Sequence, residues 1–269
     1  MPFQARGLAP VLCKKLDDFI ATHDMPALYR SFAWGNDLHA EGFPDILKLE
    51  TALRASDQGS GVSAQDAQDV ARWGALPGWP RVRLAGNAAS ALPPLTLRDA
   101  AGNTQAACDG NPEAAMRLLA TNTVGIGPVY DSKVLRFACP EDFGAIDTWV
   151  VRVFGRGDPL FAAEGKWLAL KVTQDRDKRW AIPEDQRGWL AEYAHWIQVL
   201  RHIAARLNEI GIACPHPPSF VRAGLRRSGE WFCADVEMAL SSHALALRVA
   251  RDRPDARHSE SLAGSSALQ

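Results

Sequence analysis

Apolar residues recur with helical spacing through most of this chain, and few segments alternate with a period of two. The longest regular pattern, 186–211, repeats apolar side chains every three or four positions and ends at Gly211, a residue typical of a helix stop. A further helix is predicted over 112–123, because Asn111 and Pro112 are a favourable N-cap and first position. The pattern predicts a mainly α fold.

Polar, proline-rich and glycine-rich stretches indicate how the helices are grouped. Residues 87–112 have the composition of a connection, and the chain from Arg251 onward is polar and rich in serine. We therefore expect an N-terminal helical lobe over 1–110, a second lobe with closing C-terminal helices over 111–250, and a flexible tail over 251–269. A cleft is expected between the two lobes.

Composition narrows the class of protein. The chain has 269 residues, of which 47% are hydrophobic and 23% charged, and its net charge is −1. These values are typical of a globular protein, and they exclude an overall positive field that could hold nucleic acid by charge alone. No stretch approaches the apolar length of a membrane span, so we expect a cytoplasmic protein that does not enter a membrane.

Candidate metal ligands are poorly spaced. The five cysteines are scattered and form no C-x-x-C pair, which argues against a disulfide framework, a zinc finger or an iron–sulfur cluster. His195 and His202 lie seven positions apart, two helical turns rather than one, so we expect no metal there. Asp235 and Glu237 lie two positions apart and face different sides of a helix. We expect them to cap a helix or pair with arginines rather than to act in catalysis.

The most informative segment is TNTVGIGPVYDSKVLRFACPEDFGAIDTWVVRVFG (121–155). A helix ends before Gly125-Ile126-Gly127, which is predicted to form a tight turn, and Pro128 starts a second helix. The unpaired N–H groups at the start of that helix lie beside two residues without side chains and suit a phosphate group. An ordinary corner between two helices would have the same pattern.

The same segment places a carboxylate at the start of a third helix. Asp147 directly precedes Thr148, where that helix is predicted to begin. The simplest role of Asp147 is an N-cap. A functional role is also open, because a helix N-terminus holds a carboxylate in its ionised form and could aim it into a cleft.

Together these residues resemble a known family. The pattern G-I-G-P, a helix, and then A-I-D-T-W-V-V-R-V is similar to the helix-hairpin-helix superfamily of DNA glycosylases. Its members carry an L-x-G-[VI]-G hairpin and, after a helix and a loop, V-D-x-x-V-x-R-V with a catalytic Asp. The pieces SKVLRFACPEDFGAIDTWVVRVFG and WFCADVEMAL also resemble bacterial 8-oxoguanine DNA glycosylase fold proteins. The strict resemblance covers about 35 of the 269 residues.

The resemblance implies a mainly α fold of two helical lobes around a cleft, with a helix-hairpin-helix DNA-binding motif. Within it, Asp147 corresponds to the catalytic carboxylate. The residues that it assigns to DNA binding are Gly125, Ile126, Gly127 and Arg152. Those expected at the base pocket are Val129, Tyr130 and Trp149, for which packing of the hairpin helices is the structural alternative.

One position departs from the family pattern. Members that also cut the abasic strand carry a nucleophilic lysine two residues after the second hairpin glycine, where this chain has Val129. Lys133 lies one turn further along the same helix face, and its flexible side chain could reach the same pocket. Lys133 is therefore the candidate nucleophile. A phosphate contact and a solvent-exposed lysine are the alternatives.

The expected function is that of a DNA glycosylase, a hydrolase of base excision repair that flips and excises a damaged or modified base, with or without a lyase step. An 8-oxoguanine-like purine is the substrate that the resemblance favours. The alternatives are a non-catalytic helix-hairpin-helix DNA-binding protein, a phage-defence glycosylase acting on modified phage bases, and an unrelated helical enzyme. DNA is the expected partner and the expected state is a monomer. We expect no cofactor, apart from a monovalent cation that the hairpin could hold.

Overall fold

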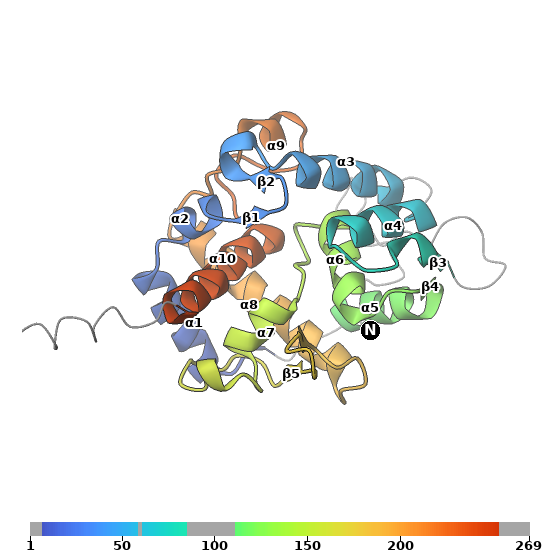
Figure 1. The fold of residues 1–269 in the computed structure, drawn as a ribbon. Coiled ribbons are helices and arrows are strands. Elements are labelled where there is room, and N and C mark those ends of the chain that lie inside the picture. Colours follow the sequence, from blue (N-terminus) through green and yellow to red (C-terminus); the bar gives the residue numbers. More distant parts are fainter. Residues whose placement is uncertain (1–6, 59–60, 85–110, 253–269) are drawn as a thin grey trace, which may run out of the picture.

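The computed structural model describes residues 7–58, 61–84 and 111–252. Within these residues the fold is mainly helical, as the sequence predicts (Figure 1). The helices are α1 (Pro10–Thr22), α2 (Met25–Arg30), α3 (Pro44–Gln58), α4 (Ala64–Trp73), α5 (Pro112–Asn122), α6 (Pro128–Ala138), α7 (Thr148–Phe154), α8 (Trp189–Glu209), α9 (Pro218–Arg222) and α10 (Cys233–Asp252). Antiparallel pairs join β1 (Ala33–Trp34) to β2 (Asp37–Leu38), β3 (Arg83–Leu84) to β4 (Thr123–Val124), and β5 (Thr173–Gln174) to β6 (Trp180–Ala181).

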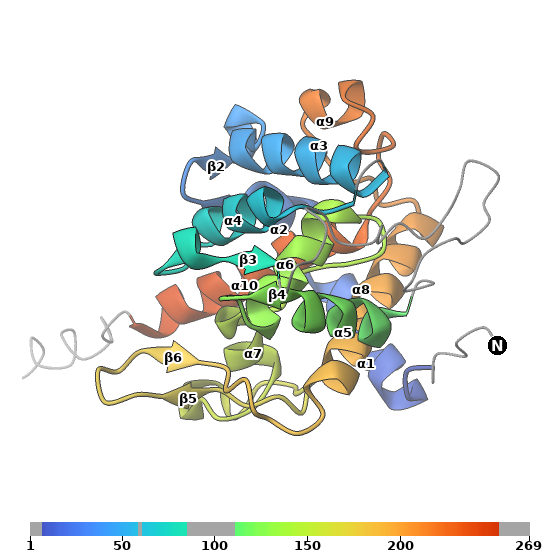
Figure 2. The same ribbon diagram turned by 90° about the vertical axis from the view of Figure 1, so that its right-hand side faces the viewer.

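The helices pack in two groups. Helix α6 contacts α3, α4 and α5, whereas α10 contacts α2, α7 and α8, and α1 lies against α8. Figure 2 looks onto the first group, and α5 links the groups by packing on α8. The helices before residue 110 contribute to both groups, so a division of the chain near that residue does not follow the packing. The predicted boundary lies outside the described residues, as does the predicted tail beyond Asp252, where α10 ends.

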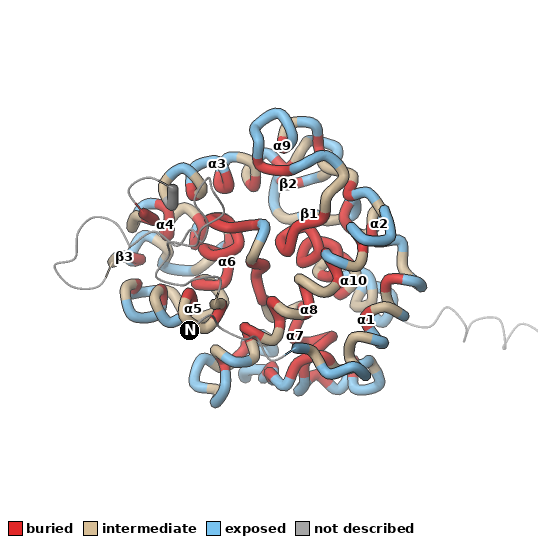
Figure 3. Tube along the Cα trace, turned by 180° about the vertical axis from the view of Figure 1, so that it is seen from behind, coloured by how far each residue is buried: buried red, intermediate tan, exposed pale blue. Residues whose placement is uncertain are grey.

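One continuous hydrophobic core runs through both groups. Figure 3 shows that its buried centre follows α6, the segment after α6, and the first half of α10. Helix α6 is buried from Asp131 to Ala138 on all sides, although its sequence contains aspartate, lysine and arginine. These charged side chains must therefore find partners inside the protein.

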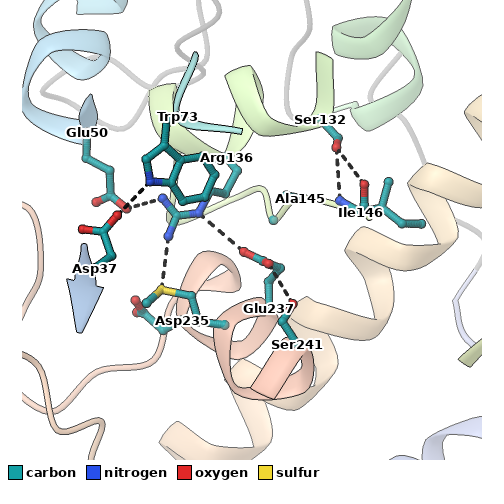
Figure 4. A network of polar contacts seen from close by, with 12 residues as sticks. Asp37, Glu50, Trp73, Ser132, Arg136, Ala145, Ile146, Asp235, Glu237 and Ser241 are labelled. Carbon is teal, nitrogen blue, oxygen red and sulfur yellow. Dashed lines mark hydrogen bonds and ion pairs between the residues drawn. The ribbon is translucent and has the colours of Figure 1, made fainter. Parts of the chain in front are cut away.

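Buried ion pairs join the helices of the two groups. Glu50 on α3 is fully buried, and its Oε1 accepts hydrogen bonds of 3.0 Å from both Arg136 on α6 and Arg226. Its Oε2 accepts a second bond of 2.6 Å from Arg226. Arg226 in turn contacts Asp235 on α10 at 3.0 Å. Figure 4 shows Arg136 reaching from α6 toward Glu50 on one side and Glu237 on the other.

We predict that Glu50→Gln lowers the free energy of unfolding by about 3–5 kcal/mol, because the substitution leaves two buried guanidinium groups without their shared carboxylate. Urea denaturation measures the change. The matched control is Asp18→Asn, which breaks the exposed pair between Lys14 and Asp18 and should change stability by less than about 1 kcal/mol. Equal, small effects of the two substitutions would contradict a stabilising role for Glu50.

Candidate active site

The predicted turn between two helices is present. Helix α5 leads through β4 into Gly125, whose φ of +93° favours glycine, and α6 begins at Pro128. A side chain at Gly125 would also lie 3.2 Å from the carbonyl oxygen of Arg81. Gly127 is extended, and the carboxylate of Glu184 lies so close to it that a side chain would collide with it. The predicted phosphate position is thus faced by an acidic side chain.

Ser132 sets the position of Asp147 relative to Lys133. Its Oγ accepts a hydrogen bond of 3.1 Å from the N–H of Ile146 and donates one of 2.7 Å to the carbonyl of Val129. Figure 4 shows the bond between Ser132 and Ile146. Because Lys133 follows Ser132 and Asp147 follows Ile146, this contact brings the two predicted catalytic residues to the same place.

Asp147 is the N-cap of α7, as predicted. Its Oδ1 accepts a hydrogen bond of 2.9 Å from the N–H of Val150. The preceding backbone is fixed from α8, where Trp196 Nε1 donates to the carbonyl of Ala145 at 2.8 Å. Asp147 is half-buried, so its carboxylate is both held by the helix N-terminus and open to a ligand.

Lys133 is enclosed by aromatic rings and is not solvent-exposed. Its side chain is 7% exposed, and Nζ lies 5.2 Å from the ring centroid of Trp34, 5.4 Å from that of Trp73 and 5.1 Å from that of Tyr130. Among the described residues, Nζ has no hydrogen bond and no ion pair. Burial lowers the pKa of Lys133, while the charge of Asp147 acts in the opposite direction. The solvent-exposed alternative for Lys133 is therefore wrong.

Two cavities meet at Lys133 and Asp147. The first, here called the lysine cavity, has a volume of about 200 Å³ and lies between α6, α7 and α10. The second, here called the hairpin groove, has a volume of about 610 Å³ and extends along Gly125, Ile126 and Gly127. The residues that line both are Trp34, Lys133, Asp147 and Trp149. The predicted catalytic pair thus lies at the boundary between the hairpin groove and the smaller lysine cavity.

A carboxylate and a guanidinium group lie in the wall of the lysine cavity. Glu237 Oε2 is 3.5 Å from Arg136 Nε, and Glu237 Oε1 accepts a hydrogen bond of 3.1 Å from Ser241. Burial raises the pKa of Glu237 to about 7, although Arg136 acts in the opposite direction. The expectation that Asp235 and Glu237 pair with arginines is confirmed. The spacing gave no sign that Glu237 also faces the cavity.

Arg152 occupies a different environment from the one expected of a DNA contact. It is 7% exposed, and its Nε lies 2.6 Å from Asp158. Its guanidinium also stacks 4.7 Å from the ring of Trp149 and 4.8 Å from that of Trp180. Arg152 is therefore neutralised inside the protein, where it fixes the ring of Trp149. Val129 and Tyr130 line the hairpin groove and not the lysine cavity, whereas Trp149 lines both.

Sequence reasoning missed the rings that enclose the lysine. Trp34 Nε1 donates to the carbonyl of Trp73 at 2.8 Å, and Trp73 Nε1 donates to Asp37 at 2.7 Å, so both indoles are held in place. Gly74 leaves the space for Lys133, because a side chain there would lie 3.1 Å from Nζ. The chain has nine tryptophans, and no local pattern distinguishes these two.

Among the residues that the structure describes, one group of side chains comes close enough to share a metal ion. Cys214, His216 and Asp235 approach one another, but Asp235 is held by Arg226, and His216 Nε2 donates to the carbonyl of Glu230 at 2.7 Å. Burial also raises the pKa of the Cys214 thiol, which opposes the thiolate that a metal would need. We assign no metal to this group.

Comparisons with known proteins return no match, whether to a family model, to a curated protein or to a solved structure. The helices in the described part of the chain include none that is both long and apolar enough to span a membrane. The interpretation of the site therefore depends on its own geometry.

Asp131, beneath the turn, gives a prediction on the pH dependence of stability. Burial raises the pKa of Asp131 to about 7, although a hydrogen bond of 3.2 Å from Thr123 acts to lower it. A raised folded pKa means that stabilisation is lost as the pH rises from about 4 to about 7. Asp131→Asn stays neutral and can still accept the hydrogen bond.

The variant should therefore be more stable than wild type by about 1–2 kcal/mol near pH 8, and the difference should shrink toward pH 4. Urea unfolding at several pH values measures this. Asp185→Asn, at an exposed position, is the control and should show no such trend. A stability difference that does not change with pH would contradict the burial of a proton on Asp131.

Proposed function

We propose that this chain is a DNA glycosylase with an abasic-site lyase step, in which Lys133 attacks the sugar and Asp147 stabilises the positive charge that develops there. The observation that carries the proposal is the amine of Lys133. It is buried, lines two cavities, and makes no hydrogen bond or ion pair among the described residues. A buried lysine with a purely structural role is normally bound directly by a carboxylate.

The two residues suit the two tasks of this reaction. A lysine attacks only as the neutral amine, and burial lowers the pKa of Lys133 in the required direction. Breaking the bond between C1′ and the base nitrogen builds positive charge on the deoxyribose, which a fixed carboxylate stabilises. Asp147 is such a carboxylate, because the N–H of Val150 holds it in place.

In this proposal α5, the Gly125–Gly127 turn and α6 act as the helix-hairpin-helix element, and duplex DNA follows the hairpin groove. The target nucleotide leaves the stack and enters the lysine cavity, which in this proposal serves as the cleft of the enzyme. Trp34, Trp73 and Trp149 supply aromatic walls. A DNA phosphate beside Gly127 would have to displace the carboxylate of Glu184.

The non-catalytic alternative explains less of the site. A DNA-binding module needs neither a cavity behind the turn nor a buried lysine, and burying an unpaired ammonium group is unfavourable.

Which base the enzyme excises is a separate question. The resemblance to 8-oxoguanine glycosylase fold proteins favours an oxidised purine in a repair reaction, and the same chemistry would serve a defence enzyme acting on modified phage bases.

Asp147→Asn tests the carboxylate. Asparagine also caps helices, so the fold should persist, while base release should fall by about 100-fold or more. Duplexes carrying a panel of oxidised, alkylated, mismatched and hypermodified bases are incubated with the protein, and alkali reveals the abasic sites. Asp185→Asn serves as the exposed control. Undiminished excision by a folded Asp147→Asn protein would remove Asp147 from the mechanism.

Lys133→Gln tests the nucleophile. Borohydride should trap a covalent adduct between the wild-type protein and DNA, because reduction fixes the imine that an attacking lysine forms. Trapping should disappear in Lys133→Gln and persist in Lys171→Gln, whose lysine is exposed. Trapping that survives in Lys133→Gln would assign the attack to another amine. Abasic sites formed without any trapping would contradict the lyase step.

A further inference from the structure

Among the described residues, a set of buried ion pairs reaches the wall of the lysine cavity, and together with Lys133 it comprises six side chains that are each at most 7% exposed. They are Lys133, Arg136, Arg226, Glu50, Asp235 and Glu237. Asp37 is also buried, but its carboxylate is bound by Trp73 and not by this group. Two guanidinium groups face three carboxylates, so the arginines alone leave one negative charge without compensation. Lys133 is the remaining cation of the group.

The net charge of this group is zero in two states. In one, Lys133 is protonated and Glu237 is ionised; in the other, Lys133 is neutral and Glu237 carries the proton. Any other pair of protonation states for Lys133 and Glu237 leaves a net charge on the buried group, which is unfavourable. We infer that Lys133 and Glu237 share a single proton, and that Glu237 accepts it when the lysine amine acts as a nucleophile.

The other members of the group are unsuited to this exchange. Arginine does not release its proton under ordinary conditions, and Glu50 is held by hydrogen bonds from two arginines. Asp235 accepts from Arg226 and from the N–H of Phe232. Glu237 is held less closely, by the hydroxyl of Ser241 and at 3.5 Å from Arg136.

Glu237 and Lys133 line one cavity, which has the room and the polar partners that a bridging water needs. Burial raises the pKa of Glu237 to about 7 and lowers that of Lys133, so burial brings the two proton affinities closer together. The balance of buried charges and the position of both side chains in one cavity thus both indicate that Lys133 and Glu237 exchange the proton.

Four further titratable or charged groups face this pair: Tyr130 on α6, Asp147 at the start of α7, Tyr193 on α8 and Arg248 on α10. Both tyrosine hydroxyls donate to backbone carbonyls. Asp147 lies outside the buried group, because it is half-buried, and its Oδ1 is occupied by the N–H of Val150.

The identity of the electrophile rests on the proposed function. The Nζ–H bond of the Lys133 ammonium breaks, and the proton passes to the carboxylate of Glu237. The freed electron pair forms the bond from Nζ to C1′, while the bond from C1′ to the base nitrogen breaks and leaves its electron pair on the base. The Glu237 carboxylic acid then protonates the departing base, which returns Glu237 to its ionised state.

The first experiment needs no DNA. Acetic anhydride acetylates neutral lysine amines, and mass spectrometry of the Lys133 peptide gives its labelling as a function of pH. In Glu237→Gln the ammonium loses its buried counter-charge, so the midpoint of labelling should move to lower pH by about one unit or more. Ser241→Ala keeps the carboxylate and should move the midpoint the same way by less. Glu209→Gln, at an exposed position on α8, should leave it in place.

The second experiment separates two steps of the DNA reaction. Glu237→Gln should slow base release by about 100-fold or more, because the departing base loses its proton donor. Borohydride trapping on DNA that already contains abasic sites needs no such donor, so it should persist and extend to lower pH. Glu237→Asp, which restores a carboxylate, should recover part of the base release.

An unchanged labelling midpoint in both Glu237→Gln and Ser241→Ala would overturn the shared proton, whatever the protein does to DNA. Equal losses of base release and of trapping in a folded Glu237→Gln protein would overturn the acceptor role. A shifted midpoint in a protein that neither excises a base nor traps abasic DNA would support the shared proton and refute the proposed function. The two failures are therefore distinguishable.

Discussion

The carboxylate of Glu50, buried between two arginines, fixes how the parts of the site face one another. Arg136 lies one turn after Lys133 on α6, so holding Arg136 also sets the direction in which Lys133 leaves the helix. Through Arg226 the same carboxylate reaches Asp235 at the start of α10. Apolar packing alone would tolerate small rotations of one helix against another, whereas hydrogen-bonded ion pairs are directional. The alignment of the site therefore depends on an ion-pair network that begins in the wall of the lysine cavity and extends beyond it.

In the proposed mechanism two carboxylates act on one amine, and their surroundings suit them to different tasks. Asp147 is half-buried and accepts a hydrogen bond from the N–H of Val150 at the start of α7. Glu237 is buried behind the cavity, where its charge is harder to maintain. Aromatic rings around Lys133 stabilise a cation without supplying a base, so they leave the proton of the amine to be controlled by the carboxylates. This division of roles depends on burial more than on residue type.

The parts of the structure that the sequence predicts are those decided within a few residues. The cap at Asn111, the turn before Pro128 and the cap at Asp147 all depend on local backbone chemistry, and each is found where it was expected. The surroundings of Lys133 come instead from Trp34 and Trp73, about 100 and 60 positions earlier, and no periodicity encodes such a contact. For Arg152, tertiary contacts that the local sequence does not encode replace the environment that the motif predicted. Its place in a family motif indicated DNA, whereas the tertiary fold brings Asp158 and two indoles onto it.

The separation in sequence between the members of the ion-pair network has a consequence for how the chain folds. Glu50 and Arg226 are 176 positions apart, and Arg136 lies between them. Closing so long a loop is entropically unfavourable until the contacts at its ends form, so such contacts tend to form late. During synthesis from the N-terminus, α3 and α6 emerge before Arg226 and the carboxylates of α10, so Glu50 can meet Arg136 earlier than it meets Arg226. The lysine cavity would lack one wall until α10 docks, so competence of the site would depend on the docking of that helix.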